Sequence, residues 1–431
     1  MKRNRVFNNK LYVYIYYFLL LLVMFSRQSA TSEPSMVIRL FFLAAVIVPI
    51  FYFKDVYYPA IITMFYTLTI NGFAYSFMPY TFSLYVIITL FIVLLFYNKG
   101  TLGVPNFLIC FALYIFLIDL IFGAGFGAGL IQSTLFCLIM LICFIKVLGR
   151  RYDGALSQLP LCFAVTTIFL SIAYLTHREQ YVLYSVGGMD RIGWTDPNYF
   201  GMVLGMGTTI GLTKVFDVEW KGFDFIDKII YIATIVVSVP VLILNASRGA
   251  ILSVIVCAVV ILMFSKTKII YKVLTVLLAV FFVIYLYNNQ YFDMLESRLL
   301  ELEDDQTGSG RTIIWQNKLT AFSSGNPLKI IFGYSHIGGS NITGRTVGFH
   351  NDFVGCLVDY GIIGLCFLLY MLYYPIKIIS KSVQSRQTVI VLIIYLATCF
   401  MTLEPFLTGI LPYFTFYLYA LLIAKKYQKT L

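Results

Sequence analysis

The sequence has little charge. Only 12% of its 431 residues are Asp, Glu, Lys or Arg, whereas 60% are hydrophobic. A soluble globular domain has about 25% charged residues and roughly 45–50% apolar ones, so this composition excludes a soluble core with a polar shell. Apolar runs of about 18 residues or more recur from Leu11 to Ile423, and each can cross the membrane as a helix. They are too long and too uniform for barrel strands, so we expect an all-α polytopic membrane protein.

The sequence also lacks the motifs of several function classes. Its eight cysteines and three histidines show neither zinc-ligand spacing nor an HExxH motif. The segment "GAGFGAG" has no strand–turn–helix context and lies between two apolar runs, which favours close helix packing over phosphate binding. There is no basic patch with interleaved aromatic residues. We therefore expect no metal, no cofactor and no nucleic-acid partner, and the lipid bilayer as the surrounding medium.

The apolar runs predict about 12–14 transmembrane helices in a single integral membrane domain, residues 1–431. An even number of spans places both termini on one side. Most of the 31 lysines and arginines lie on that side, in segments such as "MKRNRVFNNK", "KVLGRRYDG" and "KKYQK". The positive-inside rule makes that side the cytoplasm. The predicted spans begin near Leu11, Met36, Val56, Thr81, Val104, Ala128, Leu159, Tyr199, Lys228, Ala250, Lys268, Asn351, Thr388 and Thr408.

Two short external segments carry arginines that topology does not require. In "GGMDRIGWTDPNYFG", Asp196 and Pro197 predict a helix start beside Arg191 and Asn198. In "LNASRGAIL", Arg248 stands at a tight turn next to the small residue Ser247. An arginine there either extends to the lipid headgroups or faces a protein cavity. Its planar fork suits phosphate or carboxylate, which favours the cavity.

The third external segment is a loop of about sixty residues, 288–349, far longer than ordinary connections. Apolar residues at helical spacing predict a surface helix from Phe292, followed by a second helix that Ser309 caps and that begins near Arg311. We expect "NPLKIIFGYSHIGG" to form a turn and a short extended piece. The segment "GRTVGFHND", with Arg345, then leads back into the membrane.

His350 lies at the external mouth of the span that follows this loop. A histidine there can accept a proton from a hydroxyl group near neutral pH. Asn351, Arg311 and Arg345 belong to the same loop system. His336 and His177 are expected to be ordinary polar loop residues. Two acids near spans, Asp119 and Asp359, have no matching chain of acids along the sequence that would indicate a proton-coupled transporter.

Four motifs in order, "DPNYFG", "NASRGAIL", "SGRTIIW" with "IFGYSHIG" downstream, and "FHNDFVGCLVDYGIIGL", resemble the O-antigen ligase and Wzy-type polysaccharide polymerase superfamily. The resemblance covers about residues 187–375. It implies glycosyl transfer, without a metal or other cofactor, on the outer face of the bacterial cytoplasmic membrane. The donor it implies is a glycan on undecaprenyl pyrophosphate, and the acceptor is a hydroxyl of a second lipid-linked unit or of lipid A core.

The resemblance also implies residue roles. Arg191, Arg248 and Arg311 would hold the pyrophosphate, and His350 would activate the acceptor hydroxyl. Supporting roles fall to Asn198, Ser247, Ser309, Arg345 and Asn351. A chain-length regulator and a flippase are candidate partners.

Three functions remain open from the sequence. A polymerase of surface polysaccharide (O-antigen, capsule or exopolysaccharide) is the first, and an O-antigen ligase of the same superfamily is the second. The third, from another class, is a flippase for lipid-linked oligosaccharides. A flippase is expected to have two related halves around a central path, and this sequence has no internal repeat.

Overall fold

The computed structural model is helical apart from one two-stranded hairpin, over the residues that it describes. These are residues 105–123, 152–176, 182–186, 189–192, 197–216, 225–304, 311–343, 348–379, 383–404, 406, 417 and 420–425. The chain divides into two compact units: unit 1 comprises residues 1–100 and 147–297, and unit 2 comprises residues 101–146 and 298–431. The predicted all-α class is confirmed for the described residues, with the hairpin as an addition.

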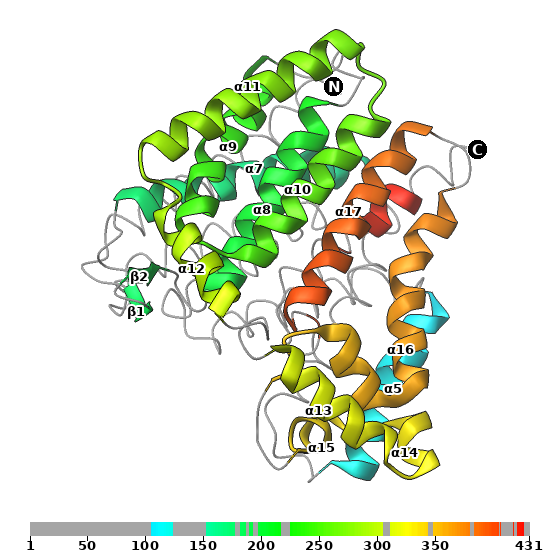
Figure 1. Cartoon of the computed structure of the whole chain (residues 1–431). Helices are drawn as coiled ribbons and strands as arrows, with labels where there is room; N and C mark the ends of the chain where they lie inside the picture. The colour runs from blue at the N-terminus through cyan, green and yellow to red at the C-terminus, as the bar shows by residue number, and fades with distance from the viewer. Residues whose placement is uncertain are drawn as a thin grey trace, which may run out of the picture. The chain divides into compact units, whose positions relative to one another are not determined.

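Unit 1 is a bundle in which α8 lies at the centre of the contacts (Figure 1). Helix α8 packs against α7, α9 and α10, and α7 also packs against α9. Small and hydroxyl side chains allow this closeness, because backbones approach tightly where side chains are short. Thr208 on α8 and Ser238 on α9 share a hydrogen bond of 2.7 Å. The helices of this unit are α7 (Tyr152–Thr176), α8 (Pro197–Val215), α9 (Phe225–Leu244), α10 (Arg248–Phe264), α11 (Ile269–Asn288) and the first part of α12 (Asp293–Asp304).

The hairpin consists of β1 (Val182–Val186) and β2 (Met189–Ile192), which pair antiparallel. A loop was the structure predicted here, without strands. The sequence signal for this hairpin is weak, because the strands have only five and four residues. Gly187 and Gly188 stand between them, and such a glycine pair favours tight hairpin turns.

Unit 2 contains the helices of the long loop. The second predicted loop helix is confirmed as α13, and the first as α12, which lies across the boundary of the two units. Helices at residues 327–332 and 336–340 occupy most of "NPLKIIFGYSHIGG", where a turn and a short extended piece were expected, and only residues 333–335 between them are non-helical. Asn326 caps the first of these helices by accepting from the N–H of Leu328, with Pro327 at the first helical position. The helices are α5 (Asn106–Phe122), α13 (Arg311–Ser323), α14 (Pro327–Phe332), α15 (His336–Ser340), α16 (Asp352–Ile378) and α17 (Val383–Thr402).

Helix α16 is interrupted at Gly361, and the interruption joins it to the loop helices. Gly361 has φ 68° and ψ −169°, a conformation that is essentially restricted to glycine. The break releases carbonyl groups of α16 from the helical ladder. Val358 O accepts from the N–H of Tyr334 at 3.0 Å, and Asp359 O accepts from the N–H of Ser335 at 2.8 Å. The α14–α15 connection is therefore hydrogen-bonded to the backbone of α16 beside the break.

Helix α5 also bonds to the backbone at the break in α16 and at the end of α14. The hydroxyl of Tyr114 donates to Tyr360 O at 2.7 Å and to Phe332 O at 3.2 Å. Below these bonds, Phe111 stacks on Phe367 of α16. Unsatisfied backbone groups are costly in an apolar surrounding, so these bonds stabilise the irregular part of α16.

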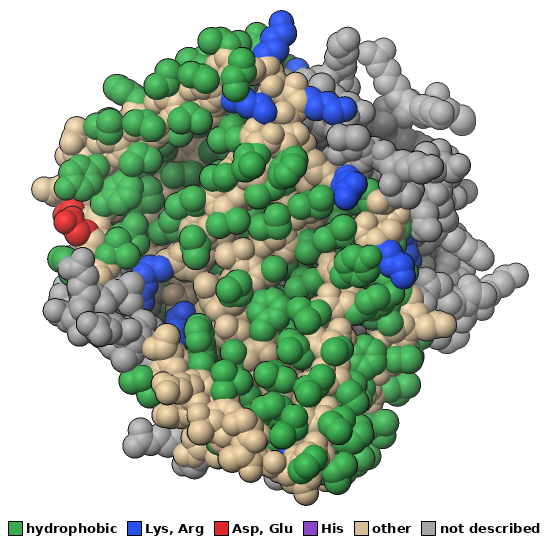
Figure 2. Space-filling model, turned by 45° about the vertical axis from the view of Figure 1, so that its right-hand side comes forward, with side chains coloured by type: hydrophobic (Ala, Val, Ile, Leu, Met, Phe, Trp, Pro, Cys, Tyr) green, Lys and Arg blue, Asp and Glu red, His purple; other side chains and the backbone are tan. Residues whose placement is uncertain are grey.

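Four of the described helices are long and apolar enough to cross a membrane, judged by length and composition: Leu159–Thr176, Phe225–Leu244, Ile269–Asn288 and Asp352–Ile378. Helix α11 exposes apolar side chains around most of its surface, as expected of a helix in lipid. Hydrophobic side chains also cover most of the face drawn in Figure 2, with Lys and Arg at few points.

Most predicted spans from Val104 onward correspond to helices of the structure. The spans predicted near Val104, Leu159, Tyr199, Lys228, Ala250, Lys268, Asn351 and Thr388 are α5, α7, α8, α9, α10, α11, α16 and α17. The spans predicted near Leu11, Met36, Val56, Thr81 and Ala128 lie outside the described residues, and so does most of the span predicted near Thr408. The count of 12–14 spans and the cytoplasmic termini stay predictions.

Replacing Gly361 by alanine should destabilise unit 2. A Cβ at this position would collide with Ile331 O, and the backbone conformation disfavours any L side chain. We expect a loss of about 1–3 kcal/mol in the free energy of unfolding, measured as a lower melting temperature of the purified protein in detergent. Gly338→Ala is the matched control, because its Cβ would meet no atom closer than 3.3 Å. Equal melting temperatures for the two variants would contradict this account of the break.

Candidate functional site

In unit 1, the structure brings two of the predicted motifs together. The turn between α9 and α10 packs on the start of α8: Asn245 Nδ2 donates to Pro197 O at 2.6 Å, and Ser247 Oγ donates to Asn198 O at 3.5 Å. A Cβ at Gly201 would lie only 2.5 Å from Cβ of Ser247, so glycine permits this contact. The motifs "DPNYFG" and "NASRGAIL" therefore form one structural element.

Two predicted arginines belong to this unit. Arg248 is the first residue of α10 and is half-buried, and Ser247 before it is buried. The first turn of a helix favours anions, because its backbone N–H groups have no partner within the helix. Arg191 lies on β2, opposite Tyr184 of β1. The backbone of β2 thus places Arg191 in a regular element, whereas the sequence placed it in a loop.

In unit 2, Arg311 and His350 both contact the C-terminal end of α17 and the residues directly after it, Thr402–Glu404. Nη1 of Arg311, the first residue of α13, donates to Thr402 O at 2.9 Å. The backbone N–H of His350 donates to the carboxyl group of Glu404, a buried side chain. Two residues predicted to act together, 39 positions apart in the sequence, therefore lie against the same three-residue segment.

Further hydrogen bonds fix the start of α16 to this segment. Asn351 caps α16, with Oδ1 accepting from the N–H groups of Phe353 and Val354, while its Nδ2 donates to Met401 O at 3.2 Å. The N–H of Asp352 donates to Leu403 O at 3.1 Å. His350 itself has φ 50°, a left-handed conformation that is uncommon outside glycine and is often found at functional sites.

One face of α13 contacts Phe349, the residue directly before His350. Arg311, Trp315, Lys318 and Phe322 follow one another at helical spacing. Trp315 Nε1 donates to Phe349 O at 2.6 Å, and the ammonium group of Lys318 lies 3.8 Å from the centre of the Phe349 ring. Phe322 and Phe349 belong to one buried cluster. The position of His350 thus depends on α13 as well as on α16.

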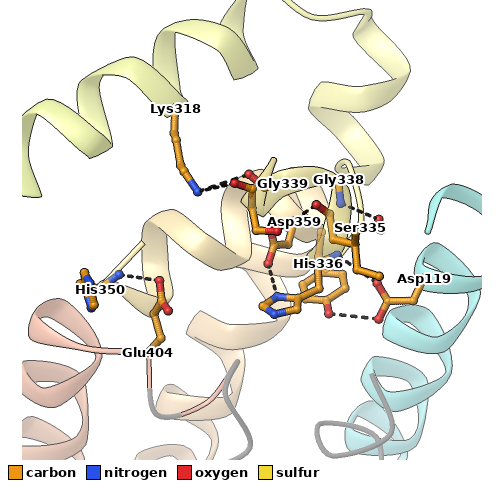
Figure 3. A network of polar contacts seen from close by, with 12 residues as sticks. Asp119, Lys318, Ser335, His336, Gly338, Gly339, His350, Asp359 and Glu404 are labelled. Atoms are coloured by element: carbon orange, nitrogen blue, oxygen red, sulfur yellow. Dashed lines mark hydrogen bonds and ion pairs between the residues drawn. The ribbon is translucent and has the colours of Figure 1, made fainter. Parts of the chain in front are cut away.

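Beside this arrangement lies a buried group of charged side chains (Figure 3). Nδ1 of His336 is 2.7 Å from Oδ2 of Asp359, whose side chain is fully buried. Asp119 on α5 accepts from the backbone N–H of His336 at 3.1 Å and from the Tyr360 hydroxyl at 3.2 Å. The ammonium group of Lys318 donates to Ser340 O at 3.2 Å. These side chains come from four helices, and Glu404 and His350 lie next to them in Figure 3.

Burial and charge alter the protonation of the groups in this cluster that lie outside the predicted spans. Burial raises the pKa of Glu404 from 4.5 to about 7. Burial lowers the pKa of Lys318. For His336, burial alone would lower the pKa, but the carboxyl groups of Asp359, Asp119 and Glu404 outweigh it and raise the pKa above 6.5.

Sequence reasoning missed this cluster. His336 was expected to be an ordinary loop residue, and that expectation is wrong: its side chain is 12% exposed and is bonded to a buried carboxyl group. Asp119 and Asp359 were set aside because no chain of acids linked them in sequence. The available signal was that Asp119, Asp359 and Glu404 are acids at or beside apolar runs, where an acid needs a partner.

Some predicted site residues are not described, and the others are divided between the two units. Ser309 and Arg345 lie outside the described residues. Arg191 and Arg248 belong to unit 1, while Arg311 and His350 belong to unit 2. The convergence of the three arginines on one pyrophosphate stays a prediction. Among the described residues, no three His, Cys, Asp or Glu side chains are arranged to hold a metal ion.

Residues 233–369 match the family model Wzy_C, described as O-antigen ligase. The resemblance is thereby confirmed for this part of the chain, which holds three of the four motifs; "DPNYFG" lies before it. Members of this family are glycan-transferring enzymes of the O-antigen ligase and polymerase type. The match includes Arg248, Arg311, His336, His350 and Asp359. No curated protein matches the chain.

The cap and cross-link made by Asn351 should contribute measurably to stability. Asn351→Ala removes the acceptor for two N–H groups of α16 and the donor to Met401 O, so we expect a loss of about 1–2 kcal/mol. Asn326→Ala, which removes the exposed cap of α14, is the matched control and should cost less. The measurement is thermal unfolding in detergent. A larger loss for Asn326→Ala would contradict the role of the Asn351 contacts.

Glu404 should make unit 2 less stable as the pH rises. The folded protein binds a proton at Glu404 up to about pH 7, whereas the unfolded chain releases it near 4.5, so stability falls between these values. We expect the melting temperature to decline over this range and the decline to be smaller in Glu404→Gln. Glu296→Gln, at an exposed acid on α12, is the control. An identical decline in wild type and Glu404→Gln would exclude Glu404 as its source.

Proposed function

We propose that the chain polymerises lipid-linked oligosaccharide repeat units into surface polysaccharide. The donor and the acceptor are both repeat units on undecaprenyl pyrophosphate, and the transfer takes place on the outer face of the cytoplasmic membrane. The match of residues 233–369 to a family of glycan-transferring enzymes supports this class of reaction. The observation that carries the proposal is the placement of Arg311 and His350 on one segment, Thr402–Glu404.

In this mechanism, Arg311 binds the pyrophosphate of the donor. As the bond from the sugar to the pyrophosphate breaks, negative charge grows on the leaving diphosphate. A fixed guanidinium group stabilises that charge where it develops, and its planar fork can hold a phosphate group through two N–H bonds. The bond from Arg311 to Thr402 O fixes the direction of the side chain. Arg248 and Arg191 add further positive charge, and Asn198, Ser247, Ser309, Asn351 and Arg345 support the site.

His350 acts as the base for the acceptor hydroxyl. The hydroxyl oxygen attacks the anomeric carbon, and the imidazole takes its proton. The contacts of Phe349, Asn351 and the His350 backbone hold the residue in an unusual left-handed conformation. A rigidly held base is favourable because it needs little reorganisation during the reaction.

An O-antigen ligase is the second candidate. The description of the matched family favours it directly. The same arginines and base would serve it, and only the acceptor would differ: lipid A core in place of a second lipid-linked unit. The residues that bind the acceptor would then determine which reaction takes place.

Arg311→Ala and His350→Ala should each abolish long chains in the producing cell. We expect about a 10²-fold fall in polymer, because removal of a general base or of an electrostatic partner typically costs this much. The measurement is the length distribution of the surface polysaccharide on gels, at matched protein level in the membrane. Arg386→Ala is the matched control, since Arg386 is exposed near the opposite end of α17. Normal chains in both site variants would rule out the assignment.

Deletion of the gene separates the candidate functions. Loss of a polymerase should leave single repeat units on the outer face. Loss of a ligase should leave long chains on undecaprenyl pyrophosphate. Loss of a flippase would trap single units on the cytoplasmic face, and that outcome would overturn the proposed class.

A further inference from the structure

His336 and Asp359 form a histidine–carboxyl pair with the geometry of an oriented acid–base group. Asp359 is fully buried and its Oδ2 lies 2.7 Å from Nδ1 of His336. Oδ1 of Asp359 has no hydrogen-bond partner among the described residues, so its only side-chain bond there is to the histidine. A carboxyl group in this position fixes the tautomer and the direction of the imidazole ring.

The other ring nitrogen of His336, Nε2, is not used in the contact with Asp359. The side chain keeps 12% of its surface exposed, and no partner of Nε2 occurs among the described residues. Figure 3 shows Asp359 meeting the His336 ring along one edge, with Glu404 and His350 farther off on one side of the pair. A buried acid that orients one ring nitrogen and leaves the other for a second partner is the arrangement by which a histidine transfers protons.

The groups around His336 come from every element packed against it. Asp119 on α5 accepts a hydrogen bond from the backbone N–H of His336. Asp359, Tyr360 and Cys356 lie on α16. Lys318 on α13 and Glu404 after α17 complete the surroundings. The acids outnumber the cations, and they raise the pKa of His336 against the effect of burial. Near neutral pH the imidazole is therefore held more in its protonated form than a free histidine is.

We propose that His336 is a second catalytic acid–base group of the transfer reaction, with Asp359 as its positioning residue. This inference rests on the proposed function. His350 takes the proton from the acceptor hydroxyl as the acceptor oxygen bonds to the anomeric carbon. The bond from the anomeric carbon to the diphosphate oxygen breaks, and its electron pair leaves with that oxygen. Protonated His336 gives its Nε2 proton to the leaving diphosphate oxygen and is later reprotonated by water.

This assignment gives the two histidines opposite tasks. The base must be neutral to accept a proton, whereas the acid must be protonated to donate one. The acids around His336 favour the protonated form, and the bond to Asp359 remains favourable in that form. Donation to the leaving group complements the arginines, because it removes negative charge that they would otherwise have to stabilise.

The test measures rates with the purified full-length protein in lipid nanodiscs. The substrate is the undecaprenyl-pyrophosphate-linked repeat unit extracted from a strain that lacks this gene. Chain extension is followed between about pH 5 and 9, a range that spans histidine titration. In wild type we expect the rate to fall at high pH, when His336 loses its proton. His336→Gln should lower kcat by about 10²-fold and remove this alkaline limb.

Two further variants separate catalysis from structure. Asp359→Asn should move the alkaline limb to lower pH, because the imidazolium loses its carboxyl partner. In His336→Ala, added imidazole should restore part of kcat without restoring the melting temperature. His177→Gln is the matched histidine control and should keep the wild-type rate and pH profile.

The outcomes distinguish this inference from the proposed function. If wild type extends chains and His336→Gln keeps both its rate and its alkaline limb, His336 is not a catalytic acid. A variant that loses rate and melting temperature together, with the alkaline limb intact and no rescue by imidazole, also overturns the inference and leaves a structural role. If wild type itself extends no chains under these conditions, the proposed function fails and this inference fails with it.

Discussion

The break in α16 at Gly361 is the constraint on which the described part of unit 2 depends. In an unbroken helix, the carbonyl groups would accept hydrogen bonds from the helix's own N–H groups, and only side chains would face the loop helices. The break exposes two carbonyl groups to Tyr334 and Ser335, and the resulting backbone pairing fixes where α15 begins. His336 follows at once, directly beside Asp359. A single glycine conformation thus decides which histidine meets which acid.

The low polarity of the surroundings explains why so many polar groups here are paired. Burying a polar group without a partner is costly, so each irregular segment of unit 2 needs several bonds to other segments. The C-terminal end of α17 and the two residues after it meet this need twice. They accept from Arg311 and the start of α16, and they supply Glu404 to the backbone of His350. The proposed base and the proposed phosphate ligand are therefore held by one structure, although α13 and α16 are separate helices.

The helical class, the positions of eight helices predicted as spans from Val104 onward and two of the loop helices followed from apolar runs and helical spacing. Their signals are local, because lipid burial acts on each span by itself. His350 at the mouth of α16 was also predicted, as was its place near Arg311. The His336–Asp359 pair was not, because it depends on a backbone break at Gly361 that brings distant segments together. The helices of "NPLKIIFGYSHIGG" were missed for a related reason: their glycines suggest an extended piece, and the Asn326 cap with Pro327 was the contrary signal.

The bond between Asp119 and His336 has a consequence for how the protein is made. The two residues are 217 positions apart, and the acid is synthesised first. At about 5–20 residues per second, roughly ten to forty seconds separate their emergence from the ribosome. During that time Asp119 stands on an apolar helix without the partners it has in the finished molecule. Glu404 comes later still. The charged cluster therefore forms only after Glu404 has been made, so a partly inserted chain holds an unfinished site and a helix, α5, whose place in the membrane is not yet secured.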